Sequence, residues 1–165
     1  MGELLTAAKL NTDLRDGLNV LLTPPLAILR STTLQNMTNG ADTVLNWALE
    51  DLDTDNGHST VTNTSRYTAQ TAGYYLLNAN VTFASSGAVT GTRRGSFRKN
   101  GTTMFSRVRQ VPSVSAYTGV VVVARVFLAV NDYVEVIGWQ DSGGTLTTDN
   151  ESFNDPRWEI QWTSK

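Results

Sequence analysis

Three aspartates alternate along one polar segment of the chain, at Asp51, Asp53 and Asp55. Carboxylates at this spacing could converge on a calcium ion, because Ca²⁺ prefers a shell of several oxygen ligands. A calcium-binding loop beginning at Asp51 would need its glycine one position before Gly57 and a glutamate in place of Thr62. The segment therefore has two interpretations, a calcium site and a solvated, turn-rich loop, and the second is favoured.

Catalytic side chains are scarce in this sequence. His58 is the single histidine, and its neighbours Ser59 and Asp55 lie in the same polar segment rather than forming a positioned triad. Glu50 and Asp51 would serve a glycosidase only at a suitable separation in space. The sequence contains no glycine-rich phosphate loop and no cluster with metal-ligand spacing. We expect no enzymatic activity and no cofactor.

Positive charge gathers on residues 92–111, which surround the dipeptide Asn100-Gly101. Two interpretations are open for these cations, contact with an anionic ligand and simple solubilisation of an outer sheet face, and the second is favoured. The residues are Arg93, Arg94, Arg98, Lys99, Arg107 and Arg109.

Several aromatic side chains could stack on sugar rings, although aromatic residues on strands more often belong to a core or an interface. The candidates are Tyr117, Trp139, Trp158 and Trp162. Because binding residues concentrate on loops, a surface glycan is expected to contact a loop such as residues 141–144 rather than these strands.

The whole composition narrows the class of protein. The chain has 165 residues, of which 40% are hydrophobic and only 17% charged, with a net charge of −2 and no cysteine. This length suits one domain with a short appendage. The charge balance argues against a nucleic-acid-binding role, and no apolar segment is long enough to span a membrane. The first residues do not resemble a signal peptide.

Residues 6–22 have the period of a helix, with Thr6 as its cap and Pro24-Pro25 ending it. An isolated helix of this length with one apolar stripe is marginal in water, so it needs a surface to pack on. That surface could be its own domain, copies of itself or a larger assembly, and its position at a terminus favours the last two. We therefore predict an attachment segment over 1–25 and a head domain over 26–165. The attachment residues are Leu10, Leu14, Leu18, Leu21 and Leu22.

From residue 26 onward the sequence consists of short strands and turns. Residues 74–84 alternate between apolar and polar side chains, and Asn100-Gly101 is a strong hairpin signal. Further strands are expected over 26–34, 43–49, 66–70, 92–99, 102–111, 120–130, 133–139 and 157–163. About ten short antiparallel strands at this spacing predict an all-β jelly-roll sandwich with a short N-terminal helix.

Residues 120–130 are apolar on both faces of the expected strand. An antiparallel strand in a monomeric sandwich usually buries one face and exposes the other. A chain of this size cannot easily supply two cores, so the second face predicts contact with another subunit. Coverage by the N-terminal helix is the alternative.

Three motifs occur in order at suitable spacing: Gly73-Tyr74-Tyr75-Leu76-Leu77, Arg98-Lys99-Asn100-Gly101, and Leu128 to Val136 with its Asn131-Asp132 turn. Together they resemble the tumour-necrosis-factor-like jelly roll of complement globular heads. The resemblance covers about residues 30–163 and implies ten strands and a homotrimer. It also implies a trimer interface at Tyr74, Leu76, Val121, Val123 and Phe127. The chain departs from the family's pattern at Asn131, where glycine is usual, and in its last strand.

The N-terminal residues Gly2 to Asn11, with Leu14-Arg15-Asp16 and Pro24-Pro25, are similar to the opening of small virion proteins of tailed bacteriophages. This resemblance implies a virion surface location and other virion proteins as partners of the N-terminal segment. Two roles follow from it. The first is a minor tail or tail-tip protein that contacts the host surface, with a surface glycan as a candidate ligand. The second is a capsid decoration or head-fibre protein that stabilises the shell.

Overall fold

The computed structural model describes residues 6–85, 90–113, 116–149 and 154–165, which form one helix and twelve strands. The helix is α1 (Ala7–Leu22). The strands are β1 (Leu26–Arg30), β2 (Asn36–Met37), β3 (Thr43–Val44), β4 (Leu49–Asp53), β5 (Arg66–Thr68), β6 (Gly73–Phe83), β7 (Arg93–Lys99), β8 (Thr103–Gln110), β9 (Thr118–Leu128), β10 (Tyr133–Gln140), β11 (Leu146–Thr147) and β12 (Arg157–Ser164).

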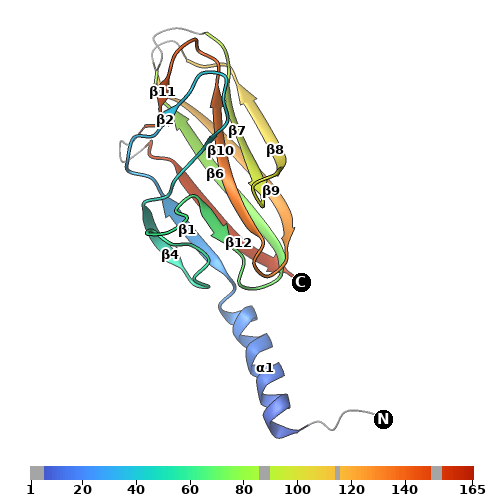
Figure 1. Cartoon of the computed structure of the whole chain (residues 1–165). Helices are drawn as coiled ribbons and strands as arrows, with labels where there is room; N and C mark the ends of the chain where they lie inside the picture. The colour runs from blue at the N-terminus through green and yellow to red at the C-terminus, as the bar shows by residue number, and fades with distance from the viewer. Residues whose placement is uncertain (1–5, 86–89, 114–115, 150–153) are drawn as a thin grey trace.

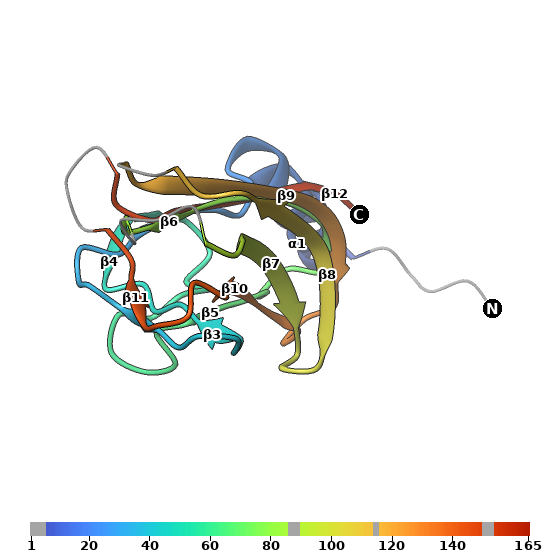
Figure 2. The same cartoon turned by 90° about the horizontal axis from the view of Figure 1, so that it is seen from above.

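The strands form two antiparallel sheets packed face to face, as the view from above shows (Figure 2). The first sheet has the order β4-β1-β12-β6-β9, and the second has the order β3-β10-β7-β8 with β5 also paired to β10. A short pair, β11-β2, forms a third sheet, and single bridges link its neighbouring residues Asn39 and Thr148 to Gln140 and Phe83 of the large sheets. The predicted antiparallel jelly-roll sandwich is therefore confirmed.

Alternating residues of the two sheets fill the space between them. On β12, Trp158, Ile160 and Trp162 point inward while the residues between them are exposed. Trp158 packs against Trp47, with 5.6 Å between ring centroids, and against Phe97 of the second sheet. Trp158 and Trp162 are thus core residues, as favoured from the sequence.

The hairpin between β7 and β8 turns at Asn100-Gly101, as predicted. Both residues have positive φ, +50° for Asn100 and +71° for Gly101, a combination that suits a tight hairpin turn and is easiest for asparagine and glycine. The Asn100 side chain also binds the neighbouring β9–β10 turn, accepting a hydrogen bond from the Tyr133 amide at 2.8 Å. The two turns therefore support each other.

Some predicted strand limits were wrong in the first half of the head. The single strand expected over 43–49 is divided into β3 and β4, because Leu45 and Trp47 turn into the core between them. The Trp47 amide donates to the Thr64 carbonyl at 2.9 Å instead of to a sheet partner. As a result β4 occupies residues that the sequence assigned to a turn-rich segment.

The helix is capped as predicted, with the Thr6 hydroxyl accepting a hydrogen bond from the Lys9 amide at 3.2 Å. It projects away from the base of the sandwich and does not lie across either sheet (Figure 1). Its partly buried contact with the core runs through Val20 near its end. Within the described residues no helix is long and apolar enough to cross a membrane.

Candidate interaction surfaces

The outward face of the first sheet carries all five residues predicted for a trimer interface. Tyr74 and Leu76 lie on β6, and Val121, Val123 and Phe127 lie on the neighbouring β9. Four of them are large and strongly exposed, namely Tyr74 (44%), Val121 (55%), Val123 (53%) and Phe127 (46%). The opposite face of β9 is buried, so the strand is apolar on both sides, as the sequence indicated.

Local geometry holds this apolar face in place. Tyr74 and Phe127 are direct cross-strand partners, and their rings meet edge to face with 5.4 Å between centroids. Leu76 pairs with Arg125 one step further along the same ladder. Burying one such apolar side chain contributes about 1.5–3 kcal/mol. Exposed apolar side chains gathered on one sheet face, here with Arg125 between Val123 and Phe127, are typical of an interaction surface.

A second apolar area on the same sheet was missed in the sequence. Leu49 and Leu52 of β4 are both exposed, and Leu52 pairs with Ile28 of β1. The exposed polar residues Glu159 and Gln161 of β12, which lies between, separate this area from the β6–β9 face. Only a correct strand assignment for residues 49–53 could have revealed it.

The predicted attachment leucines all lie exposed on α1. The exposed fraction of the five side chains, Leu10, Leu14, Leu18, Leu21 and Leu22, ranges from 41% to 79%. An isolated helix does not retain such a stripe without a partner, because its stability depends on covering an apolar face. The structure places these residues as expected, and their role in attachment remains a prediction.

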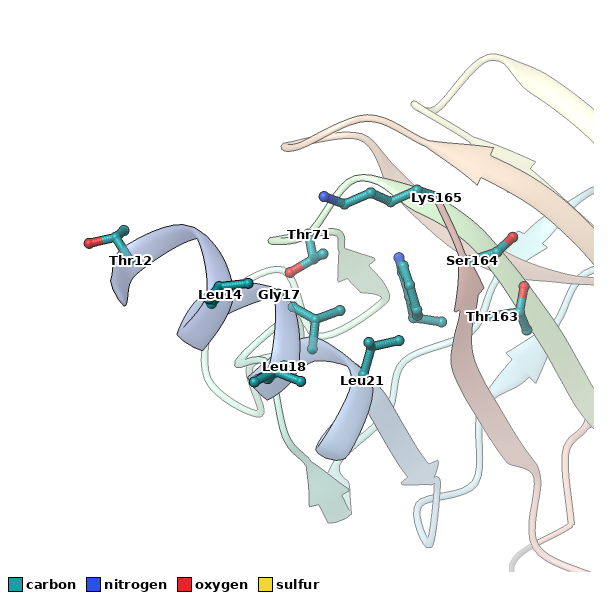
Figure 3. A pocket seen from close by; sticks show the side chains of 11 residues that line it. Thr12, Leu14, Gly17, Leu18, Leu21, Thr71, Thr163, Ser164 and Lys165 are labelled. Atoms are coloured by element: carbon teal, nitrogen blue, oxygen red, sulfur yellow. The ribbon is translucent and has the colours of Figure 1, made fainter. Parts of the chain in front are cut away.

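A groove of about 910 Å³ lies between α1 and the end of β12. Leu14, Leu18 and Leu21 form its helical wall, and residues 162–165 form the opposite wall (Figure 3). The Thr163 hydroxyl in that wall donates to the Tyr74 carbonyl at 3.0 Å. This hydrogen bond ties the β12 wall of the groove to the backbone of β6 at Tyr74.

The three alternating aspartates do not form a calcium loop. Asp51 binds the Arg30 guanidinium through both carboxylate oxygens, at 2.6 and 2.7 Å, which lowers the pKa of its carboxyl. Asp53 accepts hydrogen bonds from the Asp55 and His58 amides. Burial raises the pKa of the Asp55 carboxyl, and the Asp53 charge adds to this rise. No group of three or more potential metal ligands exists in the part of the chain described.

His58 serves the packing of the same loop. Its side chain is fully buried, with Nδ1 at 3.1 Å from Glu50 and Nε2 at 3.2 Å from the Thr64 carbonyl oxygen. Both ring nitrogens are therefore engaged. The Ser59 hydroxyl accepts hydrogen bonds from the Val61 and Thr62 amides and helps to form the turn. The arrangement is structural, and it offers no nucleophile oriented by the histidine.

The hairpin cations divide between the two sides of the second sheet. Arg93 is fully buried and donates to the carbonyls of Thr90 and Thr92, while Lys99 binds Asp132 at 2.7 Å. The other four share the outward face with Arg66 of β5. They are Arg94, Arg98, Arg107 and Arg109.

No protein-family model and no curated protein matches this sequence. Solved structures with the same fold do match. The globular domain of zebrafish complement 1qA protein superposes with a TM-score of 0.61 at 10% identity, covering 86% of this chain and 98% of that one. Murine APRIL at pH 5.0 gives 0.63 at 15% identity, covering 83% and 98%. Eiger TNF from S. frugiperda gives 0.61 at 13% identity, covering 86% and 95%.

These similarities cover nearly all of the neighbouring domains, and they establish the fold of the head. The chain has the jelly roll of complement and tumour-necrosis-factor globular heads, as its motifs predicted. At such low identity the likeness shows the fold alone, because one fold can host many functions.

Proposed function

We propose that this chain is a structural protein of a bacteriophage virion, a homotrimeric surface head attached to the particle by its N-terminal segment. The observation that carries the proposal is the exposed apolar face of β6 and β9, with Val121, Val123 and Phe127 at its centre. A free monomer would leave this face in water, and a partner subunit would cover it.

Three copies rather than two are proposed from the resemblance to the tumour-necrosis-factor-like family. The jelly-roll fold supports this choice because it supplies the same kind of sheet, with β6 and β9 at one edge. One wall of the groove beside α1 is tied to β6 by the hydrogen bond from Thr163 to the Tyr74 carbonyl, at the end of the strand where this face begins.

The exposed leucines of α1 support attachment to other virion proteins. The helix projects from the base of the head (Figure 1). Leu21 and Leu22 in its last turn are the most exposed of the five. An apolar stripe on a projecting helix fits a groove in a larger assembly. The head would then extend from the particle surface into solvent.

We favour a minor tail or tail-tip protein that contacts the host surface, and capsid decoration is the alternative. Two measurements test the proposed trimer and its proposed location on the particle. Light scattering on the purified chain should give the mass of three copies, and gold-labelled antibody against the head should decorate one end of the tail. Label spread over the capsid would replace the tail role by decoration. A monomer, or particles without label, would contradict the proposal.

A further inference from the structure

The outward face of the second sheet has a surplus of positive charge. Its acidic residues within the described chain are Asp42 and Glu135, against five arginines. Glu135 is shared between Arg98 at 2.8 Å and Arg66 at 3.6 Å, and Asp42 binds Arg94. Among the described residues, Arg107 and Arg109 form no ion pair with an acid, and both are exposed.

These cations are placed close together at a cost to the sheet. Arg94 and Arg109 are direct cross-strand partners, and like charges in such a pair destabilise a sheet. Burial is the main cause of the lowered pKa of Arg94, and the nearby charges of Arg107 and Arg109 lower it further. Both Arg94 and Arg109 lie against the Trp139 ring, at 4.6 and 5.5 Å from its centroid. Trp139 thus holds two guanidinium groups together despite their repulsion.

A β-bulge puts Arg107 beside them. In a regular strand Phe105 and Arg107 would point to the same side, because side chains alternate. The register of β7 and β8 shifts between Gly95 and Phe97, and Ser106 adopts a positive φ of +48°, which is uncommon for serine. Phe105 therefore packs inward against Phe97, with 5.8 Å between their ring centroids, while Arg107 joins the outward cations.

We propose that the exposed Arg107 and Arg109 form a binding site for an anionic polysaccharide, supported by Trp139 and by the buried Arg94, which is paired with Asp42. Guanidinium groups bind carboxylate, phosphate and sulfate groups through paired N–H donors. Arg107 and Arg109 lie two residues apart on β8, which corresponds to about 7 Å along a strand, and Arg94 lies directly across from Arg109 on β7. Two exposed cations at this spacing suit anionic groups that recur along an extended chain better than they suit a single ion.

A polysaccharide fits better than nucleic acid as the ligand. Duplex DNA carries about one negative charge per 1.7 Å of its axis, more than a polysaccharide with one charge per sugar unit. A chain with a net charge of −2 and a pI of about 5.3 therefore repels DNA more strongly beyond the arginine face. The choice of a cell-surface polysaccharide rests on the proposed host contact. The existence of the anion site itself rests on the sheet geometry alone.

Binding to immobilised dextran sulfate, polygalacturonate, neutral dextran and duplex DNA tests this site. We expect the full chain to bind one or both anionic polysaccharides, to ignore neutral dextran and to be released by salt. Arg109→Gln should weaken binding about fivefold, and adding Arg107→Gln should weaken it by about the same factor again. Binding to dextran sulfate alone identifies a sulfate-type ligand, and binding to polygalacturonate extends the site to carboxylates.

Arg157→Gln is the matched control, because it removes one exposed arginine from the first sheet and should leave binding unchanged. Equal binding by all variants, absence of binding to both polyanions, or tighter binding to DNA would overturn the inference. The mass of each sample is measured in the same experiment. A trimer that binds neither polyanion would refute the site while leaving the proposed assembly intact. A monomer that binds through these arginines would support the site and contradict the proposed assembly.

Discussion

The outward faces of the two sheets are built by the same alternation of side chains, yet they differ in chemistry. On the first sheet, β6 and β9 present Tyr74, Val121, Val123 and Phe127 to solvent. On the second sheet, β7, β8 and β10 present arginines around Trp139. One side of the sandwich is therefore suited to contact protein and the other to stay in water.

The difference shows what each surface requires from its surroundings. The apolar face lowers its free energy by being covered, so it favours assembly without any particular ligand. The cationic face is soluble as it stands, and Asp42 already pairs with Arg94, while Arg107 and Arg109 have no acidic partner among the described residues. If the first face is covered by sister subunits, the second face is directed outward. The division separates assembly from contact with the surroundings.

The largest effect is expected when the apolar face is given a charge. Val123→Asp or Phe127→Asp should abolish the trimer, because an unpaired carboxylate buried in the interface costs on the order of 3–5 kcal/mol. Light scattering should then show monomer or aggregate. Val61→Asp is the matched control, since Val61 is a loop residue with 85% exposure and should tolerate the charge. A trimer of normal stability in either face variant would remove this interface assignment.

A smaller effect is expected when the exposed leucine stripe of α1 is given charges. The double change Leu14→Asp and Leu18→Asp removes two apolar contacts worth about 2 kcal/mol together, since both side chains are already partly exposed in the free chain. The head should remain folded and trimeric, but incorporation into particles should fall, as measured by immunoblotting of purified virions. Asn19→Asp, on the exposed surface of the same helix, should be incorporated normally. Loss of the folded head, followed by circular dichroism, would mean that α1 belongs to the core.

Much of the first face could be predicted because its signal is local. Alternation along residues 74–84 and the two apolar faces of 120–130 depend only on the period of a strand, and the structure places them as expected. The helix and the Asn100-Gly101 turn were likewise encoded within a few residues. Leu49 and Leu52 were missed because Leu45 and Trp47 interrupt the expected strand by turning into the core.

The second face could not be derived in the same way because its geometry depends on distant partners. The bulge at Ser106 carries no clear signal in the sequence, and without it Arg107 would be assigned to the wrong side. Asp51 illustrates the same difficulty. Its partner Arg30 lies on another strand, and that ion pair removes it from the calcium site that the spacing suggested. Ionic networks of this kind follow from the fold rather than from local spacing.

A third test concerns the contacts of Asp132, which link the β9–β10 turn to the β7–β8 turn. Asp132 binds Lys99 at 2.7 Å and the Asn100 side chain at 2.7 Å, and these contacts lower the pKa of Asp132 to about 2. Asp132→Asn should therefore reduce the free energy of unfolding by about 1–2 kcal/mol at neutral pH.

The stabilisation by Asp132 should depend on pH in one direction. Because the pKa is lower in the folded state than its ordinary value of 3.8, the stabilisation is present above about pH 4 and is lost as the pH falls through about 2. Urea unfolding of the unaltered protein and of the Asp132→Asn variant, from pH 7 to pH 2, measures the difference in the free energy of unfolding. The variant is the reference because every other carboxyl titrates in both proteins. A difference that stays constant down to pH 2 would show that the charge of Asp132 contributes nothing.

The smallest expected effect bears most directly on the contrast between the faces. Arg107 forms no ion pair with an acid in the described residues and lies near the charge of Arg94, so Arg107→Gln should stabilise the free protein by about 0.2–0.5 kcal/mol. Arg157→Gln should act in the opposite direction, because Arg157 lies 3.6 Å from the buried Asp155 carboxylate. Chemical denaturation at low and high salt can measure both, and salt should reduce the gain from Arg107→Gln by screening the repulsion. A gain in stability combined with weaker polyanion binding would mean that the arginine face is maintained for a ligand at the expense of the fold. A loss of stability in both variants would instead make Arg107 an ordinary structural residue, and the two faces would then differ only in solubility.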